Sequence, residues 1–338
     1  MSLQFIMGNS GSGKSYCLYD TVVREAIENP DKNYLVIVPE QFTMQTQKDL
    51  CLAHPKGGIM NIDVLSFGRL AYRVFEEVGQ DARVVLDDEG KNLVLRKIAG
   101  ECEKDLKVFK GNLKKQGYIS EVKSVLSEFA QYGVDFERLD DFMKEVPPES
   151  YLHYKLDDIR TIYEKFEEYL SEKYITKEEM LDVLSDAVPY SDILKGSVVA
   201  MDGFTGFTPV QNRLIGELFS VCEKVMITVT MDGRENPYVY EHPYQIFALG
   251  KQMVTSLMKI AGEKKTEIEE PICLFERPVY RFRDCSEMAF LETELFRYSG
   301  AKYNGSCESV SLHEVRSPGK EAKYVAESIR RLVRTKGY

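Results

Sequence analysis

The sequence predicts an α/β fold in which a parallel sheet is flanked by helices and interrupted by an all-helical insertion. Three observations predict it. Short apolar runs alternate with helix-length amphipathic segments in the first third, about 100 residues then show only helical periodicity, and the alternation resumes near residue 197. Strands separated by helices imply βαβ units, and therefore a parallel sheet.

The first third opens with an apolar run at 3–7, which glycines separate from a helical segment ended by Asn29-Pro30-Asp31. The continuous β-branched run at 34–38 is typical of a strand buried on both faces. Ser66 is a helix cap, and apolar residues follow it at helical spacing. The predicted strands are 3–7, 34–38 and 58–64, and the predicted helices are 14–28, 43–53 and 66–78.

The middle of the chain shows only helical periodicity, with prolines at Pro147, Pro148 and Pro189. The predicted helices are 89–102, 119–132, 136–145, 153–174 and 176–187. We therefore predict one discontinuous α/β domain, 1–86 with 190–338, and a helical insertion at 87–189.

The last part returns to alternating elements and then stops after a loop signal, so we expect a fragment of a longer protein. The predicted strands are 197–201, 225–230 and 310–315, and the predicted helices are 209–221, 244–261, 286–298 and 320–335.

Composition excludes several classes of protein. With 43% hydrophobic and 29% charged residues the chain is neither collagen-like nor disordered. No apolar run is long enough to span a membrane, and the first strand leaves no room for a signal peptide, so we expect a cytoplasmic protein. The net charge of −10 argues against strong non-specific DNA binding by this chain alone. The seven cysteines and four histidines are scattered, so we nominate no metal site from them.

One motif predicts phosphate binding. The run Gly8-Asn9-Ser10-Gly11-Ser12-Gly13-Lys14-Ser15 matches the pattern G-x-x-x-x-G-K-[ST], and it lies between an apolar strand and a helix. Glycines let successive N–H groups turn toward an anion, and the helix N-terminus adds partial positive charge. Lys14 would reach the β- and γ-phosphates of ATP, and the Ser15 hydroxyl would bind Mg²⁺.

A second acid is expected at the end of another apolar strand. Asp202 directly follows the run at 197–201 and is our candidate for holding Mg²⁺. The alternative is that Asp202 is an ordinary turn residue before Gly203.

The residues after Asp202 depart from an active motor. Helicase-type ATPases place a glutamate there to orient and deprotonate the attacking water. Here Gly203 follows, and the next carboxylate along the chain is Glu217. Loss of a general base slows chemistry by about 10²–10⁴-fold, so the sequence predicts ATP binding with weak or no hydrolysis, and we nominate no catalytic residue.

These segments resemble a known family. The chain is similar to the N-terminal part of AddB, also called RexB, one of the two subunits of the bacterial AddAB helicase–nuclease in the UvrD-like superfamily-1 group. The segments that show it are MSLQFIMGNSGSGKS, VIVPEQFTMQTQKDL, NIDVLSFGRLAYRVFEEVG, MDGFTGFTPVQNRLI, FLETELFRY and SPGKEAKYVAESIRRLVRTKGY.

The resemblance implies a RecA-like P-loop domain. Residues 8–15 would be motif I, 36–45 motif Ia and 63–70 motif Ib, while Asp202 would be the motif II aspartate with Gly203 in place of its glutamate. The insertion would match the helical 1B subdomain. Members of the family continue with a second motor-like domain and a C-terminal nuclease domain with an iron–sulfur cluster, which we do not expect in 338 residues.

The resemblance also implies partners. They are an AddA-like helicase–nuclease subunit, forming a heterodimer, and DNA in the assembled complex, which repairs double-strand breaks by homologous recombination. In the family, DNA crosses motifs Ia and Ib, so Phe42, Thr43, Ser66 and Phe67 are candidate DNA contacts by stacking and phosphate binding. The alternative makes the two phenylalanines core residues and the two hydroxyls helix caps. A basic stretch, either a solvated loop or a further phosphate contact, comprises Lys104, Lys107, Lys110, Lys114 and Lys115.

The predicted function is thus a degenerate, nucleotide-binding helicase-like domain. Two alternatives stay open: an active DNA-stimulated ATPase with its general base supplied elsewhere, and a P-loop phosphotransferase, which would need an arginine-rich lid that the insertion does not suggest.

Overall fold

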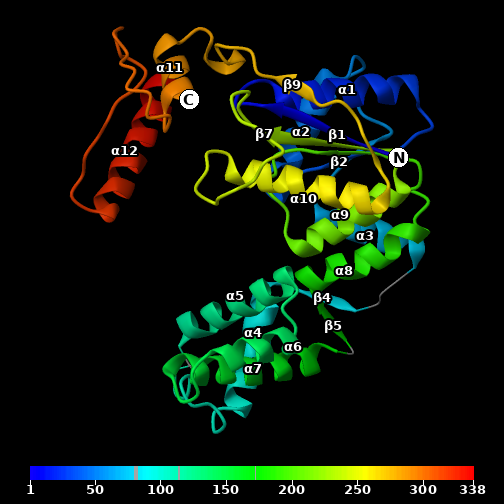
Figure 1. Ribbon diagram of the computed structural model, residues 1–338, viewed down its shortest axis with the longest axis vertical. Coiled ribbons are helices and arrows are strands. Elements are labelled where there is room, and N and C mark those ends of the chain that lie inside the picture. The colour runs from blue at the N-terminus through cyan, green and yellow to red at the C-terminus, as the bar shows by residue number, and fades with distance from the viewer. Residues whose placement is uncertain (80–82, 113–114, 172) are drawn as a thin grey trace. The chain divides into compact units, whose positions relative to one another are not determined.

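The computed structural model describes residues 1–79, 83–112, 115–171 and 173–338 (Figure 1). The chain forms two compact units, Met1–Phe275 and Glu276–Tyr338, and each is described by itself.

The first unit is built on a seven-stranded parallel sheet with the order β3-β2-β6-β7-β1-β8, in which β9 also pairs with β1. The strands are β1 (Ser2–Gly8), β2 (Tyr34–Ile37), β3 (Ile62–Leu65), β6 (Val198–Met201), β7 (Lys224–Thr230), β8 (Glu267–Ile268) and β9 (Ile272–Leu274). The order places β7 between β1, which leads into the predicted phosphate loop, and β6, which leads to Asp202.

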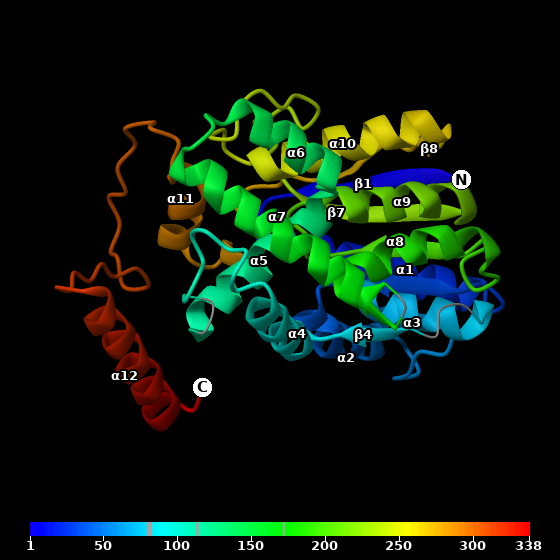
Figure 2. The ribbon, with the colours of Figure 1, turned by 90° about the horizontal axis from the view of Figure 1, so that it is seen from below.

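Helices cover both faces of this sheet because its strands are apolar on both sides. In β1, Phe5 packs in the core beneath α3, α8, α9 and α10, while Ile6 packs in the core beneath α1 and α2. Figure 1 shows α1 and α10 on opposite sides of the strands, and Figure 2 shows α10, α9, α8 and α3 in a row. Their bounds are α1 (Lys14–Glu28), α2 (Thr43–Ala53), α3 (Phe67–Val78), α8 (Lys177–Ala187), α9 (Pro209–Val221) and α10 (Ala248–Lys264).

The helical insertion has a core of its own. Its helices are α4 (Asp88–Glu101), α5 (Gln116–Tyr132), α6 (Phe136–Glu145) and α7 (Tyr151–Leu170). Two short strands, β4 (Val84–Leu86) and β5 (Tyr174–Thr176), pair in parallel where the chain enters and leaves the insertion.

The predicted α/β fold with a parallel sheet, flanking helices and a helical insertion is therefore confirmed. Helix α8 follows β5, and its Met180 and Leu184 pack in the core of the main sheet, although it lies within the predicted insertion 87–189. The division at 86/87 and 189/190 stays a prediction.

The second unit contains α11 (Ser286–Glu294) and α12 (Pro318–Lys336). No residue of α12 is buried, and its apolar side chains Val325, Ile329 and Val333 are exposed.

Two strand predictions need correction. The strand predicted at 58–64 begins only at Ile62, because the Asn61 side chain donates hydrogen bonds to the carbonyl oxygens of Ala26, Asn29 and Lys32 and holds the preceding residues in a loop. The strand predicted at 310–315 is wrong, because these residues form no ladder with a neighbouring strand in the described chain and are mostly exposed.

Candidate functional site

The predicted phosphate loop joins β1 to α1, as its motif requires. Gly11 and Gly13 have φ of 86° and 95°, in the left-handed region that favours glycine. The amide of Ser12 donates to the carbonyl oxygen of Asn9 at 3.1 Å, which closes the turn. Helix α1 begins at Lys14 with no side chain capping its N-terminus, since its N-cap residue is a glycine.

Lys14 lies back across this loop. Its Nζ donates to the carbonyl oxygens of Gly8 at 3.0 Å and Asn9 at 2.9 Å. These two bonds fix the ammonium group over the start of the loop, although Lys14 belongs to the helix at the loop's other end. The positive charge of Lys14 is thereby held at the turn of the loop, where it would attract the negative charge of a polyphosphate.

Two observations indicate that the interior of the loop can hold an anion. The Ser12 Oγ is buried and has no hydrogen-bond partner among the described residues, so a hydroxyl donor is enclosed there without an acceptor. A Cβ at Gly8 would collide with that oxygen, and would lie 2.7 Å from the carbonyl oxygen of Leu274. Only glycine leaves the cradle open, and a phosphate oxygen would satisfy Ser12.

Asp202 lies at the carboxyl end of β6 and is only 7% exposed. Its Oδ1 accepts a hydrogen bond from Thr228 Oγ1 on β7 at 2.6 Å, and its Oδ2 accepts one from the Tyr19 hydroxyl on α1 at 2.8 Å. The Tyr19 hydroxyl is also 3.2 Å from Thr46 Oγ1. Burial and the adjacent Asp202 carboxylate raise the pKa of Tyr19, so this phenol stays protonated and remains a donor. Sequence reasoning missed Tyr19 and Thr228, although Tyr19 follows Ser15 by one helical turn.

The residue after Asp202 has a backbone conformation that disfavours a glutamate. Gly203 has φ of 79°, and a Cβ there would contact Pro39 Cδ at 3.5 Å and Phe42 Cδ2 at 3.6 Å. The following loop is held by aromatic packing, with Phe67 5.4 Å from Phe204 and 6.3 Å from Phe207 between ring centroids. The backbone at Gly203 therefore disfavours any residue with a Cβ, a glutamate included.

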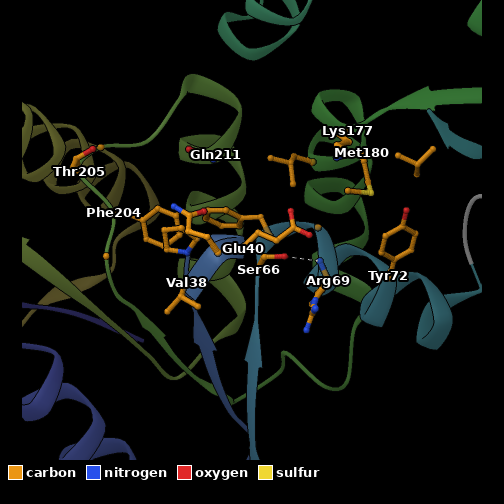
Figure 3. Close-up of a pocket in the computed structure, with 18 residues that line it drawn as sticks. Val38, Glu40, Ser66, Arg69, Tyr72, Lys177, Met180, Phe204, Thr205 and Gln211 are labelled. Carbon is orange, nitrogen blue, oxygen red and sulfur yellow. Dashed lines mark hydrogen bonds between the residues drawn. The ribbon is translucent and has the colours of Figure 1, made fainter. Parts of the chain in front are cut away.

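A cavity of about 560 Å³ opens at the carboxyl ends of β2, β3 and β6 (Figure 3). Figure 3 shows Phe204 on one side and Tyr72 on the other, and the charged residues Glu40, Arg69 and Lys177 also line it. Open α/β sheets bind ligands at this edge, so the cavity lies on the side of the sheet where a ligand is expected.

The candidate DNA contacts have different environments. Ser66 and Phe67 line this cavity, where Ser66 Oγ caps α3 by accepting from the Arg69 amide and Phe67 is largely buried. Phe42 is 47% exposed, whereas Thr43 is buried and donates to the carbonyl oxygen of Glu40. Ser66 and Phe67 thus line the cavity, Phe42 directly follows its lining residue Gln41, and Thr43 is turned inward.

The basic stretch is partly folded onto α7. Lys107 Nζ pairs with Asp157 at 2.9 Å, and the buried Asp158 carboxylate accepts the amides of Lys107, Val108 and Phe109. Lys114 lies outside the described residues.

Among the described residues, no group of three His, Cys, Asp or Glu side chains is arranged to hold a metal ion. A magnesium ion carried by a nucleotide takes ligands from phosphate and water, with few from protein, so such a group is not required. The assignment of Ser15 and Asp202 to Mg²⁺ stays a prediction.

Comparison with known proteins gives the family. The family model described as "ADDB, N-terminal" matches residues 5–292. The chain belongs to the AddB N-terminal family. It is 42% identical over 342 aligned residues to a protein of Lachnoclostridium phytofermentans, 35% identical over 336 to one of Thermoanaerobacter pseudethanolicus and 32% identical over 340 to one of Clostridium tetani.

Each of these relatives is named as the B subunit of an ATP-dependent helicase/deoxyribonuclease. The alignments cover 99–100% of this chain but only 29–30% of each relative, so the chain spans less than a third of their length. The resemblance inferred from the sequence motifs is confirmed. Within the described residues, no helix is both long and apolar enough to cross a membrane.

Proposed function

We propose that this chain is a RecA-like, nucleotide-binding domain that holds ATP with Mg²⁺ and hydrolyses it weakly or not at all. The observation that supports binding most directly is the loop at 8–15, where an enclosed Ser12 hydroxyl lacks an acceptor and Lys14 is fixed over the turn. The sheet order agrees with a RecA-like domain. One strand, β7, lies between β1, which leads into the loop at 8–15, and β6, which leads to Asp202.

Weak hydrolysis follows from the residues around Asp202. A glutamate in place of Gly203 would need a left-handed backbone, which side chains with a Cβ adopt only under strain. The next carboxylate along the chain, Glu217, forms an ion pair at 2.9 Å with Lys264, the last residue of α10. A site without a general base binds its nucleotide but does not activate water efficiently.

Magnesium would be held by Ser15 and Asp202 together with the nucleotide, and when bound it would neutralise charge on the β- and γ-phosphates. Thr228 and Tyr19 orient the Asp202 carboxylate by donating one hydrogen bond to each oxygen. Each carboxylate oxygen has two acceptor positions, so these bonds leave room for a further partner.

The wider role we propose is that of the AddB component of an ATP-dependent helicase/exodeoxyribonuclease, acting in double-strand break repair with an AddA-like partner. The names of the relatives support this proposal. DNA would cross the cavity at the carboxyl edge, with Phe42, Ser66 and Phe67 as contacts and Arg69 and Lys177 as nearby cations. The nuclease activity and the iron–sulfur cluster of the family would belong to parts outside this chain.

The test measures binding and turnover in one preparation. We expect the nonhydrolysable analogue AMP-PNP with Mg²⁺ to raise the melting temperature, and ATP with single-stranded DNA to release little or no phosphate. Lys14→Ala should weaken binding at least about tenfold, because an ammonium–phosphate bond contributes roughly 1.5–3 kcal/mol. The exposed Lys56→Ala is the matched control and should bind as the native chain does.

Two results would contradict the proposal. An unchanged melting temperature at millimolar AMP-PNP would exclude nucleotide binding. Steady phosphate release that DNA stimulates and Lys14→Ala abolishes would support the active ATPase instead.

A further inference from the structure

The segment that follows β7 lies beside the phosphate loop. Strands β1 and β7 pair in parallel up to Gly8 and Thr230, and the Met231 amide then donates to the Gly8 carbonyl oxygen at 3.0 Å. Because both strands end at the same edge of the sheet, Asp232 follows Met231 at this edge as Asn9 follows Gly8.

This segment contains a preorganised ion pair. Asp232 is only 1% exposed, and its two carboxylate oxygens accept from Arg234 Nε at 3.1 Å and Nη2 at 2.7 Å. The Arg234 amide donates to the same carboxylate at 2.9 Å. Such a fork fixes the plane of the guanidinium. The Arg234 side chain is nevertheless 42% exposed, so a ligand can reach it from solvent.

The alternation of β7 indicates the face on which this pair lies. Val229 and Met231 pack in the core beneath α10, whereas Thr228 points to the opposite face and bonds Asp202 beneath α1. The ladder continues one residue past β7 to Met231, so the same alternation, extended by one more residue, gives Asp232 the face of α1 and of the phosphate loop. Glu235 then turns to the other face and pairs with Lys251 of α10 at 2.7 Å.

We propose that Arg234 binds the γ-phosphate of a nucleoside triphosphate held in the loop at 8–15, and that Asp232 is the residue that positions it. This inference rests on the proposed nucleotide site. In the proposed site, Asp202 at the end of β6 would hold the magnesium ion that neutralises the γ-phosphate, so the γ-phosphate would lie toward β7, the strand between β1 and β6.

This role suits a site that binds without cleaving. A guanidinium stays charged at every physiological pH, so Arg234 can hold a phosphate but cannot take a proton from water. The site would then distinguish triphosphate from diphosphate by affinity, and the nucleotide state of the domain would be set by binding and release.

The experiment compares the dissociation constants of AMP-PNP and ADP, each with Mg²⁺, by calorimetry on the full chain. Arg234→Ala should weaken AMP-PNP binding at least about tenfold and ADP binding less than about twofold. Arg234→Lys keeps the charge but loses the fork, so its AMP-PNP affinity should be intermediate. Asp232→Asn should lower the AMP-PNP to ADP preference several-fold, which a purely structural role would not do.

The matched control is Arg213→Ala. Arg213 on α9 is also half-exposed and paired with two aspartates, Asp182 and Asp186, and its loss should leave both affinities unchanged. The inference is wrong if Arg234→Ala and Arg234→Lys change neither affinity, or change both equally, while Lys14→Ala still weakens binding at least about tenfold. If the native chain binds neither nucleotide, the proposed function itself fails.

Discussion

At the scale of single residues, Asp202 is a polar group at the buried end of an apolar sheet. Its carboxylate is tied to α1 through Tyr19 and to β7 through Thr228, so one side chain connects the helix that follows the phosphate loop with the strand beside it. A buried carboxylate that loses a donor keeps the cost of desolvation, so each hydroxyl contributes to stability.

We predict that Tyr19→Phe lowers the free energy of unfolding by about 1–2 kcal/mol, because Asp202 Oδ2 loses its donor while the ring still fills the core. Urea unfolding followed by circular dichroism measures this. Tyr16→Phe is the matched control, since Tyr16 is 75% exposed and should lose less than about 0.5 kcal/mol. Equal midpoints for the two variants would mean that the bond to Asp202 contributes nothing.

At the scale of elements, the contact between α7 and α8 contains two carboxyl groups that face each other. Glu179 closes the capping box of α8 by accepting from the Thr176 amide at 2.7 Å, and Glu167 on α7 hydrogen-bonds to it. Burial first, and then the Glu179 carboxylate, raise the pKa of Glu167 to about 7. Also lining the contact are Lys91, Lys123, Tyr163 and Glu178, of which Lys91 pairs with Glu178 at 2.7 Å.

This contact predicts a pH dependence. Between about pH 4.5 and about 7 the folded chain keeps a proton on Glu167 that the unfolded chain has lost, so stability falls as pH rises through this window. Glu167→Gln keeps the hydrogen bond without the charge. We expect it to match the native chain at pH 5 and to exceed it by roughly 2–3 kcal/mol at pH 8, measured by urea unfolding.

The exposed neighbour Glu168→Gln serves as the control for that series and should follow the native pH profile. A Glu167→Gln profile parallel to the native one at every pH would show that Glu167 titrates normally in the folded chain.

At the scale of the whole molecule, the hydrophobic core clusters of the described residues all lie in one unit. Every buried residue of the four clusters falls within Met1–Phe275, and helix α12 of the second unit buries none of its side chains. The core clusters of the first unit are therefore built from its own residues.

We predict that a chain of residues 1–275 folds and binds AMP-PNP with an affinity within about twofold of the full chain. The reason is that the phosphate loop, Asp202 and Arg234 all belong to the first unit. Calorimetry and thermal unfolding on both chains provide the comparison. Aggregation of the shorter chain, or a tenfold loss of affinity, would show that residues 276–338 complete the fold or the site.

Local signals were enough to predict most helices and the long strands. The predicted bounds of α1, α2, α6 and α9 are those of the structure, because caps, prolines and apolar spacing act within a few residues of each helix. The very short strands β4, β5, β8 and β9 were missed, since two or three residues have no period and their pairing partners are distant in the sequence.

The sequence by itself determined the α/β class, the phosphate motif at 8–15, the acid at position 202 and the loss of the glutamate after it, because each depends on residue type and short spacing. Only the tertiary structure decided what surrounds them. Distant segments meet where Tyr19 and Thr228 surround Asp202, where the segment after β7 bonds to Gly8 through the Met231 amide, and where α8 packs on the main sheet. Such contacts depend on strand order and register, which hydrophobic patterns restrict but do not specify.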